Sequence, residues 1–548
     1  MDTVRDEIHP QLALAHAAAR RAGAYASVEK RTGIAGNGFL ELLVDLDDKR
    51  HGHIVCTCKG TGETFRLAFA PQRIGLAEGQ FDASTARIAG FEAQNTPQLA
   101  RISVHIDYGC FNMETSYAIQ RGQHVIQKSI VIHGIQQPLH LQRASLFRQT
   151  AAPGCQVLLH DGGIYYPIVF LRGRRNSLFF CVDFPGYFAS VEGADFELYY
   201  LPDATLEPGR GYRLLTAHVG ICELTGRSRV NPYHETAAHL DVGEQQWFRE
   251  YISLGRQPID APLLEIEAPG LGIAGPSELE VLDQCAWLGA KHVLMPRIVA
   301  SLDSHPLATT VKNRIRDENI HAALLLQRDM PESQVPGLDT AIHREFDACV
   351  SLEEIDRILV DRYLTHVDRH GLRDAELTGR PITPSDAGEE SEFARMESIH
   401  RALQGLVEIV ATLREESSHV TCFGAYGSYG IGVSRLSDGL SLIAEEHPLA
   451  LPDIHVGRLF ADMQRLYFRR SLSFLLPRTS LITSVGLVPQ ACPNAPYPGA
   501  DHYPWYLYHD RAGWRYGIIS AIAVGLRHRF HAMPHDMSPE DRAFAVKW

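Results

Sequence analysis

The feature that most constrains the fold is a regular alternation of strand-like and helix-like segments over residues 263–548. Strand-like runs such as LLEIE, HVLMP, HAALLLQ, HVTCFG and LITSVG are separated by segments with helical periodicity. Two of the helical segments begin with a capping-box spacing, Ser277 with Glu280 and Ser351 with Glu354. Six or more such units in series favour a parallel (β/α)8-type TIM barrel, with an open doubly wound sheet as the alternative.

Residues 38–211 carry a different pattern. Short runs rich in β-forming residues, such as FLELLVDLD, GHIVCTC and SLFFCVDFP, are separated by Gly, Pro and Asn. Many short strands at this spacing predict a large, supersandwich-like β-sandwich with two broad antiparallel sheets. We expect a helical segment over 1–37 and a linker over 212–262, which leads into the barrel over 263–548. The expected fold class is therefore multidomain, β plus α/β.

The charge and the cysteines exclude several classes of protein. The chain has 548 residues, which is long for one domain, and a net charge of −13. A basic face, which phosphate binding needs, is not expected, so we predict no nucleic-acid partner. Acidic residues near the amino terminus and the lack of a long apolar run predict neither a signal peptide nor a membrane span. The ten cysteines are scattered through apolar segments, which predicts buried thiols in a reducing, cytoplasmic compartment.

No cofactor or metal is expected from the motifs. No glycine-rich nucleotide motif lies on a strand-to-helix turn, and Cys56 and Cys58 have no second pair to complete a zinc site. A serine-hydrolase elbow and an H-E-x-x-H spacing are also missing from the sequence. The sequence does not decide the oligomeric state, and a homo-oligomer is compatible with it.

One strand-like stretch, His370–Gly379, carries two carboxylates and a hydroxyl. Asp374, Glu376 and Thr378 stand at alternate positions, so we expect them on one face of a strand. In a parallel barrel, chemistry is placed at the carboxyl ends of the strands. The stretch is therefore a candidate for the catalytic centre.

Four stretches of the sequence carry a family resemblance. They are WLGAKHVLM from Trp287, HGLRDAELTG from His370, SRLSD from Ser434 and the aromatic HYPWYLYHD from His502. They resemble the clan of retaining α-galactosidase-type glycosidases that includes the melibiases, and the resemblance covers roughly residues 40–548. It implies a β-sandwich before a catalytic barrel, and a glycoside ligand at the carboxyl-end mouth of that barrel. It also implies a nucleophile at the position of Thr378 and an acid/base at Asp438.

The sequence departs from the pattern of that clan at two places. The early barrel strand leads into Met295, Pro296 and Arg297, where the clan has an acidic pair. Thr378 stands at the nucleophile position, although attack at an oxocarbenium-like centre requires an anionic oxygen. We therefore expect Asp438, Glu376 and Asp374 as catalytic candidates. The candidates for binding the substrate are Arg297, Thr378, Arg435, His502, Tyr503 and Trp505.

Each candidate also has a structural interpretation. Glu376 could be a barrel-interior carboxylate paired with Arg297 or Arg435, and Asp438 a carboxylate at a helix start. The aromatic residues could pack a loop onto a core rather than stack on sugar rings. Three functions stay open: a divergent glycoside hydrolase or transglycosidase, an inactive pseudoglycosidase that binds sugars or serves assembly, and an unrelated chemistry on the same barrel.

Overall fold

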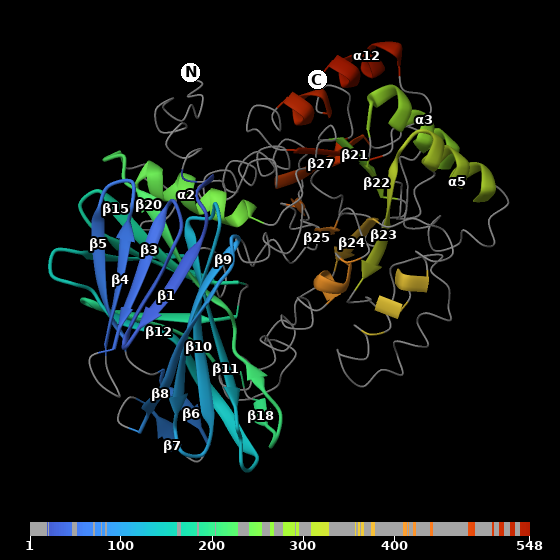
Figure 1. Cartoon of the computed structure of the whole chain (residues 1–548). Coiled ribbons are helices and arrows are strands. Elements are labelled where there is room, and N and C mark those ends of the chain that lie inside the picture. Colours follow the sequence, from blue (N-terminus) through green and yellow to red (C-terminus); the bar gives the residue numbers. More distant parts are fainter. Residues whose placement is uncertain are drawn as a thin grey trace. The chain divides into compact units, whose positions relative to one another are not determined.

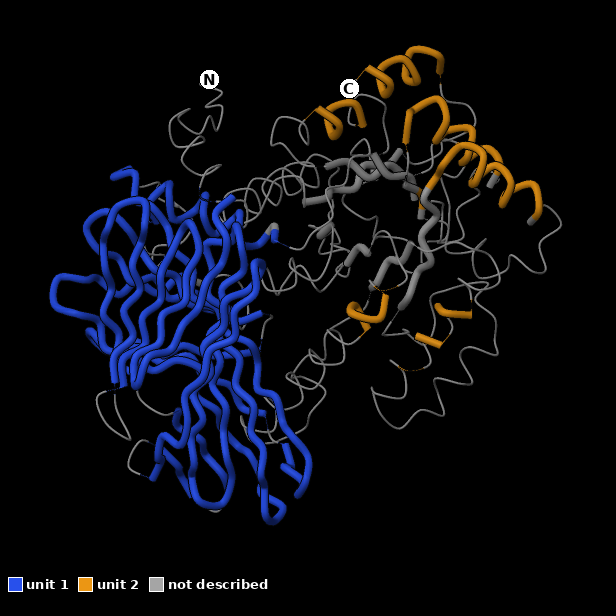
Figure 2. The backbone as a smooth tube through the Cα atoms, viewed as in Figure 1, with its two compact units in different colours: residues 1–254, 390–400 blue, residues 255–389, 401–548 orange. Residues whose placement is uncertain are grey.

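The computed structural model describes two compact units, which we treat separately (Figures 1 and 2). Unit 1 comprises Met1–Leu254 and Glu390–His400, and unit 2 comprises Gly255–Glu389 and Arg401–Trp548. In unit 1 the described residues are 19 and 21–254, without 47–51, 70–71, 78, 83–84, 162–165, 184–185, 203 and 228–239. In unit 2 they are 264–267, 278–290, 292–294, 308–327, 357, 360–361, 363–365, 374–378, 409–413, 415, 420–422, 439–441, 481–487, 507–508, 514–519, 527–531 and 538–547.

The first sheet of unit 1 is an antiparallel meander in chain order. Its strands are β1 (Tyr25–Glu29), β2 (Thr32–Gly36), β3 (Leu40–Asp45), β4 (Gly52–Cys58) and β5 (Glu63–Phe69). Burial alternates along β3, β4 and β5, so each presents one apolar face to the core. On β5 the buried residues are Phe65, Leu67 and Phe69. The predicted helical segment over 1–37 is therefore wrong for residues 25–36, where β1 and β2 form a hairpin.

The second sheet is the largest described part of unit 1. Its order is β13 (Gln156–Asp161), β14 (Pro167–Arg172), β15 (Asn176–Val182), β20 (Ala217–Glu223), β11 (Val125–His133), β10 (Asn112–Gln120), β9 (Leu99–Asp107) and β8 (Arg87–Asn95), with β19 (Tyr212–Arg213) on β11. Strands β1 and β2 of the first sheet contact β8, β9 and β10.

The third sheet has the order β16 (Phe188–Glu192), β17 (Asp195–Tyr200), β12 (Leu139–Thr150), β6 (Ile74–Leu76) and β7 (Gly79–Phe81), with β18 (Ala204–Leu206) on β12. The β-rich amino-terminal unit is thus confirmed.

The predicted linker over 212–262 begins too early in the chain, because β20 and a following helix belong to unit 1. β20 pairs with β15 on one side and with β11 on the other, which makes it a central strand of the second sheet. The segment 212–224 reads as a strand in the sequence, but its partners lie up to 95 residues earlier, as for Val125 and Gly220, and periodicity cannot reveal them. Unit 1 therefore extends through β20 and the helix α2 (Val242–Ser253) that follows.

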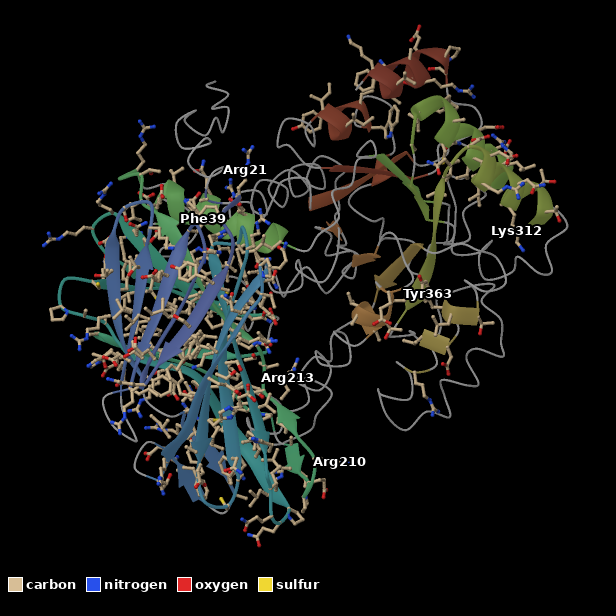
Figure 3. All side chains as sticks on the ribbon, in the orientation of Figure 1. Arg21, Phe39, Arg210, Arg213, Lys312 and Tyr363 are labelled. Atoms are coloured by element: carbon tan, nitrogen blue, oxygen red, sulfur yellow. The ribbon has the colours of Figure 1, made fainter. Side chains whose placement is uncertain are left out.

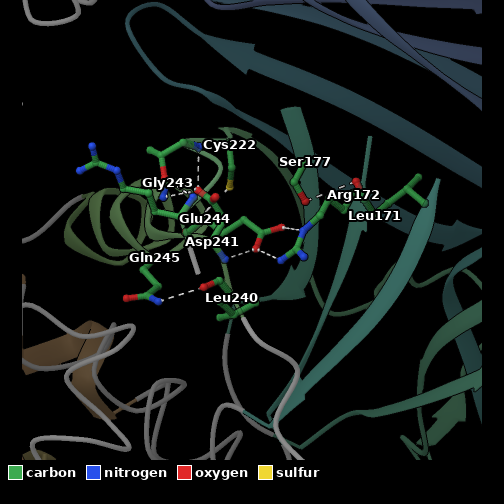
Figure 4. Close-up of polar contacts among 11 residues, drawn as sticks. Leu171, Arg172, Ser177, Cys222, Leu240, Asp241, Gly243, Glu244 and Gln245 are labelled. Atoms are coloured by element: carbon green, nitrogen blue, oxygen red, sulfur yellow. Dashed lines mark hydrogen bonds and ion pairs between the residues drawn. The ribbon is translucent and has the colours of Figure 1, made fainter. Parts of the chain in front are cut away.

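A buried polar cluster fixes α2 on the second sheet (Figure 4). Asp241 caps the helix by accepting from the backbone N–H of Gly243 at 2.7 Å, and Glu244 closes the capping box. The Glu244 side chain is fully buried and receives two hydrogen bonds from the Arg172 guanidinium, at 3.1 and 2.5 Å. Phe248 of α2 packs on Phe179, with ring centroids 5.0 Å apart.

An aromatic contact also joins α2 to Phe39, the residue before β3. Phe39 lies beside α2, with its ring 5.8 Å from that of Trp247 (Figure 3). The helix is therefore held on the core of unit 1 by aromatic packing as well as by the ion pair between Arg172 and Glu244.

In unit 2, eight of the described strands pair in parallel and close on themselves. They are β21 (Leu264–Glu267), β22 (His292–Leu294), β23 (His321–Gln327), β24 (Asp374–Thr378), β25 (Val420–Cys422), β26 (Gly439–Ser441), β27 (Leu481–Leu487) and β29 (Arg527–His531). Pairing of β29 with β21 closes this parallel ring, and β28 (Leu507–Tyr508) is attached to β27. The sequence predicts six of these strands but neither β26 nor β29.

Helices are described between several of these strands. α3 (Glu278–Leu288) follows β21, α5 (Ala308–Asp317) follows β22, and α12 (Pro539–Lys547) follows β29. Further helical residues lie at 360–361, 363–365, 409–413 and 514–519. No helix in the described part of the chain is long and apolar enough to cross a membrane.

Candidate functional site

The predicted strand around Glu376 is confirmed as β24, within the parallel ring. On one side Leu325 of β23 is the register partner of Glu376, and Gln327 that of Thr378. On the other side β24 pairs with β25, where Thr421 is the partner of Glu376. Thr378 is the last residue of β24, so it stands at the carboxyl end of the strand. Glu376 lies two positions earlier, about 6.6 Å along the strand, and Asp374 is the first residue.

The bounds of β26 show at which end of this strand the catalytic candidate Asp438 falls in the sequence. Gly439 is the first residue of β26 and pairs with Thr421. Asp438 lies outside the described residues, but in the sequence it comes directly before Gly439, at the amino end of the strand. The carboxyl end of β26 leads instead toward Glu445 and Glu446. Because chemistry in parallel barrels is placed at carboxyl ends, this acidic pair is a candidate that the sequence reasoning missed.

The aromatic candidates come, in the sequence, just before a strand that pairs with the carboxyl end of β27. Gly486 and Leu487, at the end of β27, pair with Leu507 and Tyr508 of β28. His502, Tyr503 and Trp505 come just before β28 in the sequence and lie outside the described residues. The same holds for Arg297, which follows β22 by three residues, and for Arg435. Thr378 thus ends a ring strand, and the aromatic segment precedes β28, which pairs with the carboxyl end of β27.

Unit 1 contains a second set of polar side chains, which form a pocket. Its volume is about 560 Å³, and its lining includes Lys128 of β11, Ser145 and Gln149 of β12, and Glu197 of β17. Burial lowers the pKa of Lys128 to about 7. The sequence reasoning missed this lysine, although a signal existed: Lys128 is in phase with Ile126, Ile130 and Ile132, which are buried.

The two cysteines of β4, Cys56 and Cys58, have buried thiols. Burial raises the pKa of the Cys56 thiol to about 12, which keeps it protonated and inert at neutral pH. The pKa of Cys58 is raised as well, first by burial and then by neighbouring acidic groups. Within the described residues, no cluster of His, Cys, Asp and Glu could hold a metal ion.

The two-unit fold is that of the GH36 alpha-galactosidases, which confirms the predicted distant relationship at the level of fold. The structure of the GH36 alpha-galactosidase AgaB from Geobacillus stearothermophilus matches with a TM-score of 0.59 at 10% identity, covering 96% of this chain and 85% of that one. A variant of AgaA from the same organism, in complex with raffinose, matches with a TM-score of 0.58 at 9% identity over the same shares. The alpha-galactosidase from Lactobacillus brevis gives 0.57 at 10% identity, over 96% of this chain and 82% of that one.

Comparisons by sequence find no relative. No protein-family model matches the chain, and no curated protein matches it. The similarity therefore lies in the order and pairing of the elements, while nearly all side chains have changed.

Proposed function

We propose that the chain is a divergent carbohydrate-active protein that takes a glycoside at the carboxyl ends of the unit 2 strands. In this proposal unit 2 is a (β/α)8-type barrel. The observation that carries the proposal is the fold shared with GH36 alpha-galactosidases over 96% of the chain. The parallel ring supports it, because Thr378 ends β24 and the aromatic segment before β28 leads to the end of β27.

Hydrolysis of a glycoside with retention of configuration requires two carboxyl groups about 5–5.5 Å apart. One attacks the anomeric carbon while the other protonates the leaving oxygen, and water then releases the sugar. Thr378 cannot supply the anionic nucleophile. Glu376 is the nearest carboxylate in β24, and Asp438, Glu445 and Glu446 are the candidates for the proton donor.

The second candidate function is a sugar-binding or assembly protein without catalysis. The observation that favours it is Thr378 at the carboxyl end of β24, where the resemblance implies a nucleophile. In that case Glu376 is a structural carboxylate of the barrel interior, and the aromatic side chains of the 502–505 segment supply the sugar contacts.

The deciding experiment measures turnover of nitrophenyl glycosides and natural oligosaccharides by the wild type and by single variants. We expect Glu376→Gln to abolish any turnover, a loss of about a thousandfold or more. Either Asp438→Asn or one of Glu445→Gln and Glu446→Gln should do the same, which assigns the proton donor. Glu29→Gln, at an exposed position of β1, is the matched control. If no substrate is turned over and galactosides still bind, the enzyme proposal fails and the binding function stands.

A further inference from the structure

The polar pocket of unit 1 lies between strands of different sheets. Tyr117 and Lys128 belong to β10 and β11 of the second sheet, whereas Ser145 and Glu197 belong to β12 and β17 of the third. Its volume of about 560 Å³ falls within the range of about 300–1,000 Å³ that is usual for small-molecule sites. Every lining residue belongs to unit 1, so the pocket is distinct from the carboxyl ends of the unit 2 strands.

Lys128 is held in the pocket by an irregularity of β12. Its side chain is 2% exposed, and Nζ donates to the carbonyl oxygen of Leu146 at 2.5 Å. The register of β12 against β17 shifts between Ser145 and Phe147, so Leu146 is the extra residue of a β-bulge. Bulges re-aim backbone groups and often occur next to sites. Among the described residues no carboxylate lies within ion-pair distance of Lys128, and the ring of Phe147 lies 4.5 Å from Nζ.

Several groups of the lining are buried without a hydrogen-bond partner. They are Arg73 Nε, Ser145 Oγ, Gln149 Oε1 and Glu197 Oε1. Ser145 and Gln149 are 1% and 8% exposed. Unpaired buried polar groups are unfavourable, and a cluster of them at one pocket indicates a partner that supplies the missing hydrogen bonds. The set contains both donors and acceptors, which is the complement of a hydroxyl group.

Two residues of the lining are held by hydrogen bonds to residues outside the lining. Gln72 accepts from Thr115 Oγ1 at 3.1 Å through its side chain, and its carbonyl oxygen accepts from the Tyr108 hydroxyl at 2.7 Å. The second carboxylate oxygen of Glu197 accepts from Arg143 at 3.0 Å. Gln72 and Glu197 are therefore already oriented, as expected for parts of a preformed site.

The charges of the lining select against anions. The pocket is lined by four carboxylates, Asp82, Glu192, Asp195 and Glu197. Its basic side chains are fewer, namely Arg73, Arg148 and Lys128. A phosphate or carboxylate ligand would meet repulsion, and an apolar ligand would leave the polar atoms unpaired. Phe69, Tyr117 and Phe196 add ring surfaces to this lining.

We propose that this pocket of unit 1 binds an uncharged polyhydroxylated molecule of the size of a mono- or disaccharide, at a site separate from the one in unit 2. Its hydroxyl groups would pair with Ser145, Gln149 and Glu197, and its size is limited by the pocket. Binding here involves no covalent step.

The test is calorimetric titration of the full-length protein with galactose, sorbitol, galacturonate and choline. We expect galactose or sorbitol to bind, and both Gln149→Leu and Ser145→Ala to weaken that binding at least about tenfold, which corresponds to about 1.4 kcal/mol. Gln94→Leu, at an exposed position of β8, should leave it unchanged. Thermal melting shows whether each variant is folded. If Gln149→Leu does not fold, the binding measured with Ser145→Ala decides the test.

Three results would overturn the proposal. They are absence of binding by both neutral probes, pocket variants that bind with the affinity and the number of sites of the wild type, and tighter binding of galacturonate or choline than of the neutral probes. Loss of binding in Glu376→Gln alone would place the sugar in unit 2, which also contradicts the proposal and leaves the proposed function intact.

Discussion

At the scale of single residues, Lys128 is the clearest case of chemistry that a sequence pattern hides. The run HVIQKSIVIHG predicts a strand, and β11 confirms it over Val125–His133. A lysine in such a strand is expected to face water. The alternation of β11 places it inside, and the carbonyl oxygen of Leu146, turned by the bulge in β12, replaces part of its hydration. The bulge depends on the pairing of β12 with β17, which local sequence does not encode.

The stability of the protein should increase with pH because of Lys128. Burial lowers its pKa from 10.5 to about 7, so between these values the unfolded chain binds a proton that the folded chain does not. Stability therefore rises with pH through this window, by at most about 1.4 kcal/mol per pH unit. Urea unfolding at pH 7, 8 and 9 measures the slope. Lys128→Met should flatten it, whereas Lys312→Met, at a half-buried position of α5, should not. Equal slopes in all three proteins would contradict the assignment.

Gly220 of β20 is a residue that the packing requires. A Cβ atom at this position would lie 1.9 Å from Cζ of Phe179, on the neighbouring strand. We expect Gly220→Ala to destabilise the protein by about 1–3 kcal/mol, because the core must shift to admit the methyl group. Chemical denaturation measures the loss. Gly211→Ala is the control, because its nearest neighbours lie at 3.9 Å. A Gly220→Ala variant as stable as the wild type would show that Phe179 has another rotamer available.

At the scale of elements, the parallel strands with long apolar patterns were predictable and the short or polar ones were not. β23 and β27 have seven residues each and follow the apolar runs in the sequence. β26 has three residues, and β29 reads as RHRFH, which resembles no buried strand. Both are defined by their partners in the ring. The same limit applies to the candidate site: β24 was predictable, whereas the acids after β26 become visible only once that strand is placed.

The attachment of α2 should depend on the buried ion pair between Arg172 and Glu244. Replacing Arg172 by Met leaves the carboxylate of Glu244 buried without its cation, and we expect a loss of about 3–5 kcal/mol. Thermal and urea unfolding of Arg172→Met measure it. The matched control is Arg174→Met, two residues later at an exposed position. Similar stability of the two variants would mean that α2 is held by Phe248 and the other aromatic contacts alone.

At the scale of the whole molecule, the position of β20 shows that the amino-terminal segment of unit 1 extends beyond residue 211. A fragment of residues 1–254 retains β20 and α2, whereas a fragment of residues 1–211 leaves β11 and β15 without the strand between them. We expect the longer fragment to show a cooperative thermal transition by circular dichroism and the shorter one to aggregate or unfold, because it exposes two unpaired strand edges. A cooperative transition in the 1–211 fragment would show that the sheet can close without β20.

The two-part organisation itself was predictable, because the change from short β runs to alternating strands and helices is written in the periodicity. The likeness to GH36 alpha-galactosidases then rests on topology, at 10% identity. What periodicity cannot give is the pairing of distant strands, and both the end of unit 1 and the closure of the ring depend on it.

The pairing of β29 with β21 has a consequence for synthesis on the ribosome. Phe530 is the register partner of Ile266, so the ring in unit 2 cannot close until residue 530 has left the ribosomal tunnel, more than 260 residues after Ile266. Unit 1, whose last sheet strand ends at Glu223, can fold long before that. During translation the apolar strands of unit 2 therefore remain without all their partners, with unpaired edges exposed. We expect the nascent chain to depend most on a chaperone during this interval.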